Sequence, residues 1–309
     1  MNKDSKIFIA GHKGLAGSAI HRMLIKNGFT NIIIKSRSEL DLRNQNDVKD
    51  FFYQEKPEYV FDAAAKVGGI YANDTYPADF IYDNIMIQTN LIDSSYKFGV
   101  KKFLFLGSVC IYPKHSTIPI VEDCLLSGHL EPTNEAYAVA KISGIKMCQA
   151  YKKQYGFNAI SLMPTNLYGP GDNYHPENSH VMAAMIRKFC YAKDNNLKEV
   201  VCWGDGSPKR EFLYSDDLAS ACILAMEKYE ENDIMNVSTG QEISIKETAE
   251  IVSESVGYKG EIIWDTSKPN GTIKRPLHID KIKKIGWNSQ TSLSEGILES
   301  IKDFRSKWS

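Results

Sequence analysis

The stretch that decides the fold is Lys6-Ile-Phe-Ile-Ala10 followed by Gly11-His-Lys13-Gly14-Leu15-Ala-Gly17. The first segment is a short apolar run typical of a buried strand, and the second carries three glycines into a helix predicted over residues 14–27. Small residues in such a turn let the backbone approach a pyrophosphate, which the positive N-terminus of the helix stabilises. The spacing is Gly-x-x-Gly-x-x-Gly, and a plain tight turn is the alternative. In this strand–turn–helix context we predict a dinucleotide site that includes Gly11, Lys13, Gly14, Leu15 and Gly17.

The same alternation of strand and helix continues through the first half of the chain. Further apolar strands are expected at residues 31–34, 59–64, 102–106 and 159–163, and further helices at 46–55, 78–98 and 134–155. Parallel strands joined by helices predict an α/β fold with a Rossmann-like doubly wound parallel sheet. Beyond Tyr168-Gly-Pro-Gly171 the pattern loosens, which indicates a smaller C-terminal substrate-binding portion. The segment Val237-Ser-Thr-Gly240 is a candidate strand that returns to the main sheet.

Composition narrows the classes of protein. The chain has 309 residues, of which 43% are hydrophobic and 24% charged, as in an ordinary globular protein. A formal net charge of −1 provides no basic field for nucleic acid. We find no signal peptide and no apolar run of about 18 residues, so we expect no membrane span and a cytoplasmic location. The six cysteines are scattered without a Cys-x-x-Cys pair, which fits a reducing compartment, and we expect no metal site.

The end of the second strand indicates which dinucleotide is bound. An acidic residue there would bind a ribose 2′-hydroxyl and repel a 2′-phosphate. This chain instead has Lys35-Ser36-Arg37, and Lys13 lies in the glycine turn, so cations are available for a phosphate and we predict NADPH. The alternative is that these charges are solvated surface, because Glu39 and Asp41 follow closely. Asp41-Leu42 is also a candidate cap for the adenine amino group.

The segment Tyr137-Ala-Val-Ala-Lys141 predicts a site for hydride transfer. A tyrosine and a lysine four residues apart share one helix face. An ammonium beside a phenol favours the phenolate, so we expect Lys141 to lower the pKa of Tyr137 toward neutrality. Such a phenol can exchange a proton with a substrate oxygen while hydride moves at the carbon. Ser108 follows the fourth strand, at the sheet edge where ligands bind, and can donate to a carbonyl oxygen.

Cys110 and His180 indicate a second reaction. A thiolate can remove a proton from a carbon next to a carbonyl, and an imidazole can return one from the other face, which inverts the centre. Each residue taken separately has a simpler alternative. A lone cysteine such as Cys110 is more often a small core residue. His180, in Asn178-Ser-His180, would more often be a loop or helix-cap residue.

Long blocks of sequence within and between these motifs are characteristic of one family. They are Ala10-Gly-His-Lys-Gly14, Ala63-Ala64-Ala65-Lys-Val-Gly-Gly-Ile70, Asn73-Asp-Thr-Tyr-Pro-Ala-Asp-Phe-Ile81, Cys110-Ile-Tyr-Pro113, Glu131-Pro-Thr-Asn-Glu135, Pro164-Thr-Asn166-Leu167-Tyr-Gly169 and Asn178-Ser-His180. Over almost its whole length the chain resembles the GDP-L-fucose synthase family, within the extended short-chain dehydrogenase/reductase superfamily.

The resemblance implies an NADPH-dependent 4-reductase of a GDP-linked 4-keto-6-deoxy sugar, with 3,5-epimerase activity that gives GDP-L-fucose. It assigns reduction to Ser108, Tyr137 and Lys141, and epimerisation to Cys110 and His180. Further cofactor contacts are implied at Ala64, Ala65, Lys141, Pro164, Asn166, Leu167 and His180. It also implies a homodimer built on helices near residues 85–98 and 135–155. Residues 1–168 would form the NADP-binding Rossmann domain, with a return near 211–245, and residues 169–210 and 246–309 the nucleotide-sugar-binding portion.

The sugar nucleotide has its own candidate residues. Trp203 can stack on a base or pack in a core. Arg210 matches the family's diphosphate-binding arginine, and its fork suits a phosphate, although an ordinary salt bridge is the alternative. Val181, Met185 and Arg187 follow His180 on a predicted helix and are expected to line the same pocket.

Two other functions stay open. The family usually has a serine where this chain has Val109, so one alternative is a relative that only reduces C4 of a related sugar, such as a heptose, without epimerisation. A remote alternative is a non-catalytic NADPH-binding scaffold, against which the presence of Ser108, Tyr137 and Lys141 argues.

Overall fold

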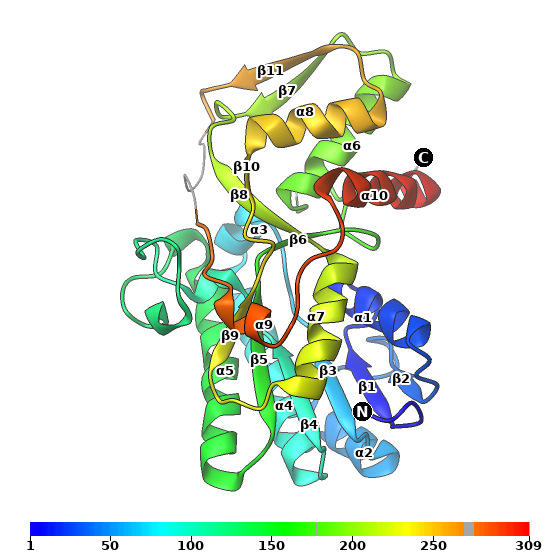
Figure 1. Ribbon diagram of the computed structural model, residues 1–309, viewed down its shortest axis with the longest axis vertical. Helices are drawn as coiled ribbons and strands as arrows, with labels where there is room; N and C mark the ends of the chain where they lie inside the picture. The colour runs from blue at the N-terminus through cyan, green and yellow to red at the C-terminus, as the bar shows by residue number, and fades with distance from the viewer. Residues whose placement is uncertain (177, 269–274, 309) are drawn as a thin grey trace.

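The structure is a computed structural model that describes residues 1–176, 178–268 and 275–308. Its centre is a six-stranded parallel sheet in the order β2-β1-β3-β4-β5-β9 (Figure 1). The strands of this sheet are β1 (Ile7–Ala10), β2 (Ile32–Ile34), β3 (Tyr59–Asp62), β4 (Lys102–Leu106), β5 (Ala159–Pro164) and β9 (Ile234–Val237). Most of these strands are fully buried, as apolar runs covered on both faces should be.

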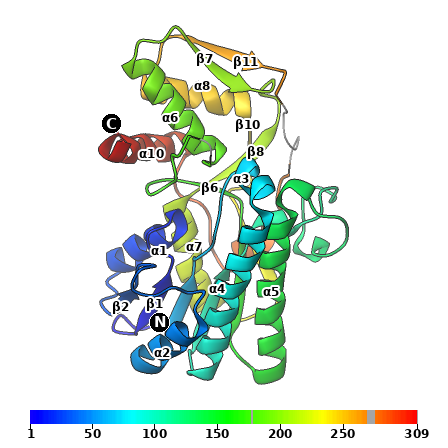
Figure 2. The same ribbon diagram turned by 180° about the vertical axis from the view of Figure 1, so that it is seen from behind.

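Helices cover both faces of this sheet. On one face lie α1 (Leu15–Lys26) and α7 (Ser215–Lys228), which pack on each other. On the other face lie α2 (Gln45–Glu55), α4 (Pro77–Lys97) and α5 (Glu135–Tyr155), as Figure 2 shows from behind. The predicted α/β class with a Rossmann-like doubly wound sheet is therefore confirmed, as are these helices of the first half.

A smaller layer lies above the carboxyl edge of the main sheet (Figure 1). It holds a three-stranded sheet in the order β10-β8-β6 and a two-stranded sheet of β11 and β7. These strands are β6 (Asn166–Tyr168), β7 (Glu199–Trp203), β8 (Lys209–Tyr214), β10 (Glu242–Ser244) and β11 (Glu261–Asp265). Three helices pack around them, namely α6 (Val181–Asp194), α8 (Ile245–Val256) and α10 (Leu293–Trp308).

The remaining elements are short. They are α3 (Ile70–Thr75), α9 (Asp280–Lys284) and the 3₁₀ turns η1 (Val109–Ile111), η2 (Glu122–Cys124) and η3 (Pro132–Asn134). Within the described ranges, no helix is both long enough and apolar enough to cross a membrane.

The buried apolar residues form two clusters. The first fills the main sheet and its helices, and the second lies among α6, α8, α10 and the small sheets. After β8 the chain returns to the main layer through α7 and β9, and β9 pairs with β5. The candidate strand near Val237 is therefore confirmed, although it ends at Val237, and Gly240 with a φ of +72° belongs to the turn that follows. Leu277, Ile282 and Trp287 also pack in the first cluster.

Candidate active site

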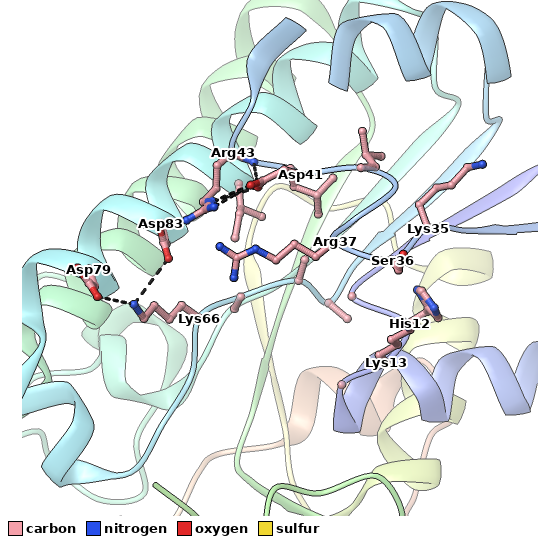
Figure 3. Close-up of a pocket in the computed structure, with 18 residues that line it drawn as sticks. His12, Lys13, Lys35, Ser36, Arg37, Asp41, Arg43, Lys66, Asp79 and Asp83 are labelled. Atoms are coloured by element: carbon pink, nitrogen blue, oxygen red, sulfur yellow. Dashed lines mark hydrogen bonds and ion pairs between the residues drawn. The ribbon is translucent and has the colours of Figure 1, made fainter. Parts of the chain in front are cut away.

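A cavity of about 520 Å³ opens beside the carboxyl ends of β1, β2 and β3 (Figure 3). The residues predicted for the dinucleotide that line it are Gly11, Lys13, Gly14, Lys35, Ser36, Arg37, Asp41, Leu42, Ala64 and Ala65. Residues that the sequence analysis did not assign to the cofactor also line it, namely His12, Leu40, Arg43, Ala63, Lys66, Asp79, Asp83 and Ile87. The other residues predicted to contact the cofactor lie outside the lining of this cavity, namely Leu15, Gly17, Lys141, Pro164, Asn166, Leu167 and His180.

The glycine turn is shaped by close backbone contacts. Gly11 has a φ of +82°, and a Cβ there would lie 2.7 Å from the carbonyl oxygen of Ala63. A Cβ at Gly17 would collide with the carbonyl oxygen of Gly11. The amide of Gly14 donates to the carbonyl of Gly11 at 3.0 Å, and Gly14 is the N-cap from which α1 begins. The N-terminus of α1 is therefore held at the cavity wall, where an anion would be stabilised.

The two sides of the cavity carry different charges. Lys35, Ser36 and His12 lie together on one side, and the Arg37 side chain extends away from them into the pocket (Figure 3). Glu39 accepts a hydrogen bond from the Ser36 amide at 2.7 Å, so a carboxylate lies close to the cations. The cations nevertheless remain on the lining, as the NADPH prediction requires.

An ion-pair network occupies the opposite side. Arg43 donates to Asp41 at 2.7 Å and to Asp83 at 3.1 Å, and Lys66 donates to Asp79 at 2.7 Å (Figure 3). Hydrogen bonding to Arg43 lowers the pKa of Asp41 to about 2. The Asp41 carboxylate is thus already bound by Arg43, which leaves less of it for an adenine amino group.

The start of α5 and the turn after β4 bring four predicted catalytic residues together. The Ser108 hydroxyl accepts from the Cys110 amide at 3.4 Å and hydrogen bonds with the side chains of both Tyr137 and Cys110. Lys141, which is 3% exposed, donates to the carbonyl of Leu106 at 2.8 Å. The Lys141 Nζ lies 6.0 Å from the centre of the Tyr137 ring.

The pKa values in this cluster follow from burial. Loss of water raises the pKa of Tyr137, the charge of Cys110 raises it further, and the hydrogen bond with Ser108 opposes both. The prediction that Lys141 lowers the Tyr137 pKa toward neutrality is therefore wrong for this structure, because desolvation dominates that pKa and the group that opposes the rise is Ser108. At neutral pH the Tyr137 phenol keeps its proton, which is the form that a proton donor needs.

Cys110 is 9% exposed, and burial raises the pKa of its thiol to about 11. The hydrogen bond with Ser108 and the charges of Lys141 and Arg275 each lower that pKa. Cys110 is thus a thiol at neutral pH, because these groups offset only part of the effect of burial, and a thiolate would form as the pH rises.

His180 is the exposed N-cap of α6 and makes no side-chain capping bond. Its loop is held near the cluster through an intermediate segment. The Gly69 amide donates to the carbonyl of Asn178 at 3.4 Å. Phe80, which contacts the Cβ position of Gly68, packs edge-on against the Tyr137 ring at 6.2 Å between centroids.

The candidate sugar-nucleotide residues fall into two groups. Trp203 is 64% exposed at the end of β7, with the Nζ atoms of Lys188 and Lys268 at 5.9 and 5.7 Å from its ring. Packing in a core, one of the two alternatives for Trp203, is therefore wrong. Arg210 donates to the carbonyl of Lys209 at 2.7 Å, and burial together with the charge of Arg275 lowers its pKa.

Two of the three candidates on α6 pack in or against the second apolar cluster. Met185 is 5% exposed in the second apolar cluster, and Val181 packs at the edge of that cluster. The Arg187 guanidinium donates to the carbonyl of Pro176 at 3.2 Å.

Three residues predicted to contact the cofactor lie at the end of β5 and in β6. Pro164 ends β5, and Leu167 packs on the first cluster. The side-chain amide of Asn166 donates to the carbonyl of Glu211 at 3.0 Å.

Comparison with known proteins identifies the class. Residues 7–238 match the model of the NAD dependent epimerase/dehydratase family. GDP-L-fucose synthase 1 of Arabidopsis thaliana is 56% identical over 299 residues, which is 97% of this chain and 93% of the relative. The chain therefore belongs to the NAD dependent epimerase/dehydratase family and, within it, to the GDP-L-fucose synthase family.

Solved structures agree over the full length. A GDP-L-fucose synthetase from Naegleria fowleri bound to NADP superposes with a TM-score of 0.93 at 29% identity, covering 100% of this chain and 95% of that one. MlghC, a GDP-mannoheptose C4 reductase from Campylobacter jejuni with NADP bound, gives a TM-score of 0.90 at 40% identity and covers 99% of each chain. The family resemblance predicted from the sequence is thus confirmed.

Proposed function

We propose that the protein is an NADPH-dependent reductase of a GDP-linked 4-keto-6-deoxy sugar, which also epimerises C3 and C5 and so forms GDP-L-fucose. The observation that supports this most directly is the shared hydrogen-bond partner of Tyr137 and Cys110, the hydroxyl of Ser108. A proton donor for reduction and a thiol for enolisation lie side by side, as two reactions on one ketone require. Relatives of the same activity at high identity support the same assignment.

The cavity beside the glycine turn fits NADPH. Gly11, Gly14 and the N-terminus of α1 would hold the pyrophosphate, and Lys35 and Arg37 the 2′-phosphate. Ala64 and Ala65 line the same cavity without filling it. NADPH supplies the hydride for C4 of the sugar, and the bound NADP in a related structure supports the choice of cofactor.

In the reduction, Tyr137 gives its phenolic proton to the C4 oxygen as that oxygen gains charge. Ser108 donates to the same oxygen and stabilises it. The Lys141 ammonium then stabilises the phenolate left on Tyr137 through its charge, at 6.0 Å from the ring. The three side chains therefore serve one proton transfer, Tyr137 and Ser108 at the C4 oxygen and Lys141 at the phenolate that remains.

In the epimerisation, the C4 ketone makes the protons at C3 and C5 acidic. Cys110, as the thiolate, removes a proton, and His180 returns one from the opposite face. The Ser108 hydroxyl and the charges of Lys141 and Arg275 favour the thiolate. Epimerisation precedes reduction, because it depends on the ketone that reduction removes.

Two sets of side chains have the chemistry to bind GDP, one for the guanine base and one for the diphosphate. The exposed Trp203 ring, flanked by Lys188 and Lys268, suits stacking with guanine near negatively charged phosphates. Arg210 and Arg275 are close enough for the charge of one to lower the pKa of the other, so a diphosphate between them would relieve their repulsion. Val181, Met185 and Arg187 would complete the wall of this pocket.

We also propose how the chain is divided between its two ligands, where the protein is located and how two copies associate. The cofactor would be held by residues 1–168 together with the return near 211–245. The sugar nucleotide would be held by residues 169–210 and 246–309. The protein would be a cytoplasmic homodimer that pairs α4 and α5, whose exposed apolar side chains include Tyr82, Val139 and Tyr155. Light scattering of the purified protein tests the dimer, and a monomer at micromolar concentration would contradict it.

A reductase that acts on a GDP-4-keto heptose without epimerising it is the second candidate. Two observations favour it: the pKa of Cys110 is raised to about 11, and the fold matches a GDP-mannoheptose C4 reductase. The identity to that reductase is 40%, against 56% for a GDP-L-fucose synthase, so the first proposal is the better supported.

Product NMR decides between these candidates. The protein is incubated with NADPH and either GDP-4-keto-6-deoxymannose or a GDP-4-keto heptose, in water and in D₂O. We expect GDP-L-fucose from the hexose, with deuterium at C3 and C5. Reduction of the heptose alone, without deuterium, would favour the second candidate. No NADPH oxidation with either sugar would favour a non-catalytic scaffold.

A further inference from the structure

Asp62 is a buried carboxylate that the mechanism above does not use. It ends β3, directly before the Ala63–Ala65 segment of the cofactor cavity, and is 1% exposed. Its Oδ1 accepts a hydrogen bond from the Ala64 amide at 3.1 Å. Its Oδ2 has no hydrogen-bond partner in the described part of the chain. A half-satisfied buried carboxylate is costly, so a compensating charge is expected nearby.

The sheet register places Asp62 under α5. Asp62 lies opposite Phe105 of β4, and Phe105 lies opposite Ser161 of β5. Residues paired in this way on neighbouring parallel strands point to the same face of the sheet. The three side chains therefore form one row across the face that α4 and α5 cover.

Three α5 positions lie along this row at helical spacing. The Lys141 Nζ is 4.6 Å from the centre of the Phe105 ring. A Cβ on Gly144 would lie 2.6 Å from the same ring, and Cys148 hydrogen bonds with Ser161. Positions 141, 144 and 148 share one helix face. The Lys141 ammonium thus lies over the part of the row that contains Phe105, next to Asp62.

The two charges are coupled. Burial lowers the pKa of Lys141, and among its neighbours Asp62 does most to raise it. Burial raises the pKa of Asp62 to about 6, and Lys141 does most to oppose that rise. The other titratable groups that face this pair are Cys110 on η1, Tyr137 on α5 and Cys148 on α5.

We propose that Asp62 is a positioning residue for the reduction, whose buried carboxylate keeps the Lys141 ammonium charged where it lies over Phe105. The hydrogen bond of Lys141 goes to a neutral carbonyl, that of Leu106, so it adds no countercharge. Without Asp62 the lysine would lose its proton at lower pH, and the phenolate formed on Tyr137 would lose its stabilising charge. Only the kinetic test of this inference depends on the proposed function.

The kinetic test is Asp62→Asn, which keeps the shape and removes the charge. We expect the alkaline limb of the kcat profile for the reduction to move to lower pH by about one unit. A merely structural role would lower kcat equally at every pH. The matched control is Asp217→Asn, since Asp217 is also buried, at 5% exposed, but accepts from the amides of Gln290 and Thr291, away from Lys141. Its pH profile should match that of the wild type.

The direct test needs no substrate. Protein labelled with ¹⁵N-lysine is titrated by NMR, and the Nζ signal of Lys141 is assigned by its loss in Lys141→Arg. We expect the Lys141 pKa to fall by about one unit in Asp62→Asn. An unchanged Lys141 pKa would overturn the inference, even if the sugar is reduced. If no GDP-4-keto sugar is turned over, the proposed function fails while this titration still decides on Asp62.

Should Asp62→Asn not fold, Asp62→Leu replaces it, because it removes both the charge and the unpaired oxygen. A lowered Lys141 pKa in that variant supports the inference. Loss of the fold in both variants would assign Asp62 to folding alone and overturn it.

Discussion

The ammonium of Lys141 lies 6.0 Å from the centre of the Tyr137 ring, while its hydrogen bond goes to the carbonyl of Leu106 at 2.8 Å. Burial raises the pKa of Tyr137, so the phenol is neutral near pH 7. In the proposed mechanism, Lys141 matters most after the proton has left Tyr137, when its charge would stabilise a phenolate in a buried site.

Tyr137→Phe should nearly abolish reduction while the fold and NADPH binding are kept. The variant removes the hydroxyl that hydrogen bonds with Ser108 and leaves the ring that packs against Phe80. Loss of a positioned acid should lower kcat on the order of 10²–10⁴-fold. NADPH oxidation with the keto sugar measures this, and NADPH binding by fluorescence is the control. Turnover within a factor of a few of the wild type would remove Tyr137 from the mechanism.

NADPH should be preferred over NADH, and Arg37→Ala should reduce that preference. Arg37 and Lys35 line the cavity, and charge-assisted bonds to a 2′-phosphate should favour NADPH by about tenfold or more in kcat/KM. The variant should weaken NADPH binding more than NADH binding. Lys26→Ala, at the exposed end of α1 outside the lining, is the matched control. Equal kcat/KM values for the two cofactors in the wild type would contradict the prediction.

The main layer of the fold was predictable because its signals are local. Apolar runs and the glycine turn identify strands and helices without long-range information, and the predicted helix over 14–27 is α1 at Leu15–Lys26. The six-residue helix α3 was missed, since it is too short to show a hydrophobic period. The paired strands β7 and β11 were also not assigned, because Glu199 and Glu261 meet across about 60 residues of chain.

The clustering of the candidate catalytic residues was predictable, and their chemistry was less so. Ser108, Tyr137 and Lys141 come together because they follow a strand end and begin a helix, positions that sequence reveals. The sign of the Tyr137 pKa shift was not predictable, since it depends on how much water the folded chain excludes. Asp62 and Arg275 were missed because each reaches the site through tertiary packing, although Asp62 is an acidic residue within an apolar strand, a signal that could have been noticed.

Glu211→Gln should stabilise the protein at alkaline pH. Glu211 is 3% exposed, lies opposite Glu242 in the β8–β10 pair, and has its pKa raised by burial to about 7. A carboxyl whose pKa is higher when folded than when unfolded binds more protons in the folded state, so stability falls as pH rises from about 4.5 to about 7. Glutamine can still accept from Ser238 and Leu277.

The gain in the free energy of unfolding should be on the order of 1–3 kcal/mol at pH 8 and should vanish near pH 5. Urea unfolding at the two pH values measures it. Glu199→Gln, at an exposed position on β7, should change stability by less than about 0.5 kcal/mol at either pH. A gain that is equal at both pH values would show that Glu211 does not titrate with folding.

Cys110→Ser should separate the two reactions. In the proposed mechanism, reduction uses Ser108, Tyr137 and Lys141, whereas proton exchange at C3 and C5 needs a base that a serine hydroxyl replaces poorly. The variant should still reduce a pre-epimerised 4-keto sugar, but it should not incorporate solvent deuterium at C3 and C5.

The wild type should incorporate deuterium with NADPH absent, and faster as pH rises. Since the pKa of Cys110 is raised to about 11, only a small fraction is thiolate at pH 7, and that fraction grows about tenfold per pH unit below the pKa. NMR of the recovered sugar between pH 6.5 and 9 would follow the exchange. A rate independent of pH would mean that Cys110 is not the base. If the wild type exchanges no deuterium on any GDP-4-keto sugar yet reduces one, the bifunctional proposal fails, and Cys110 and His180 are left with binding or packing roles.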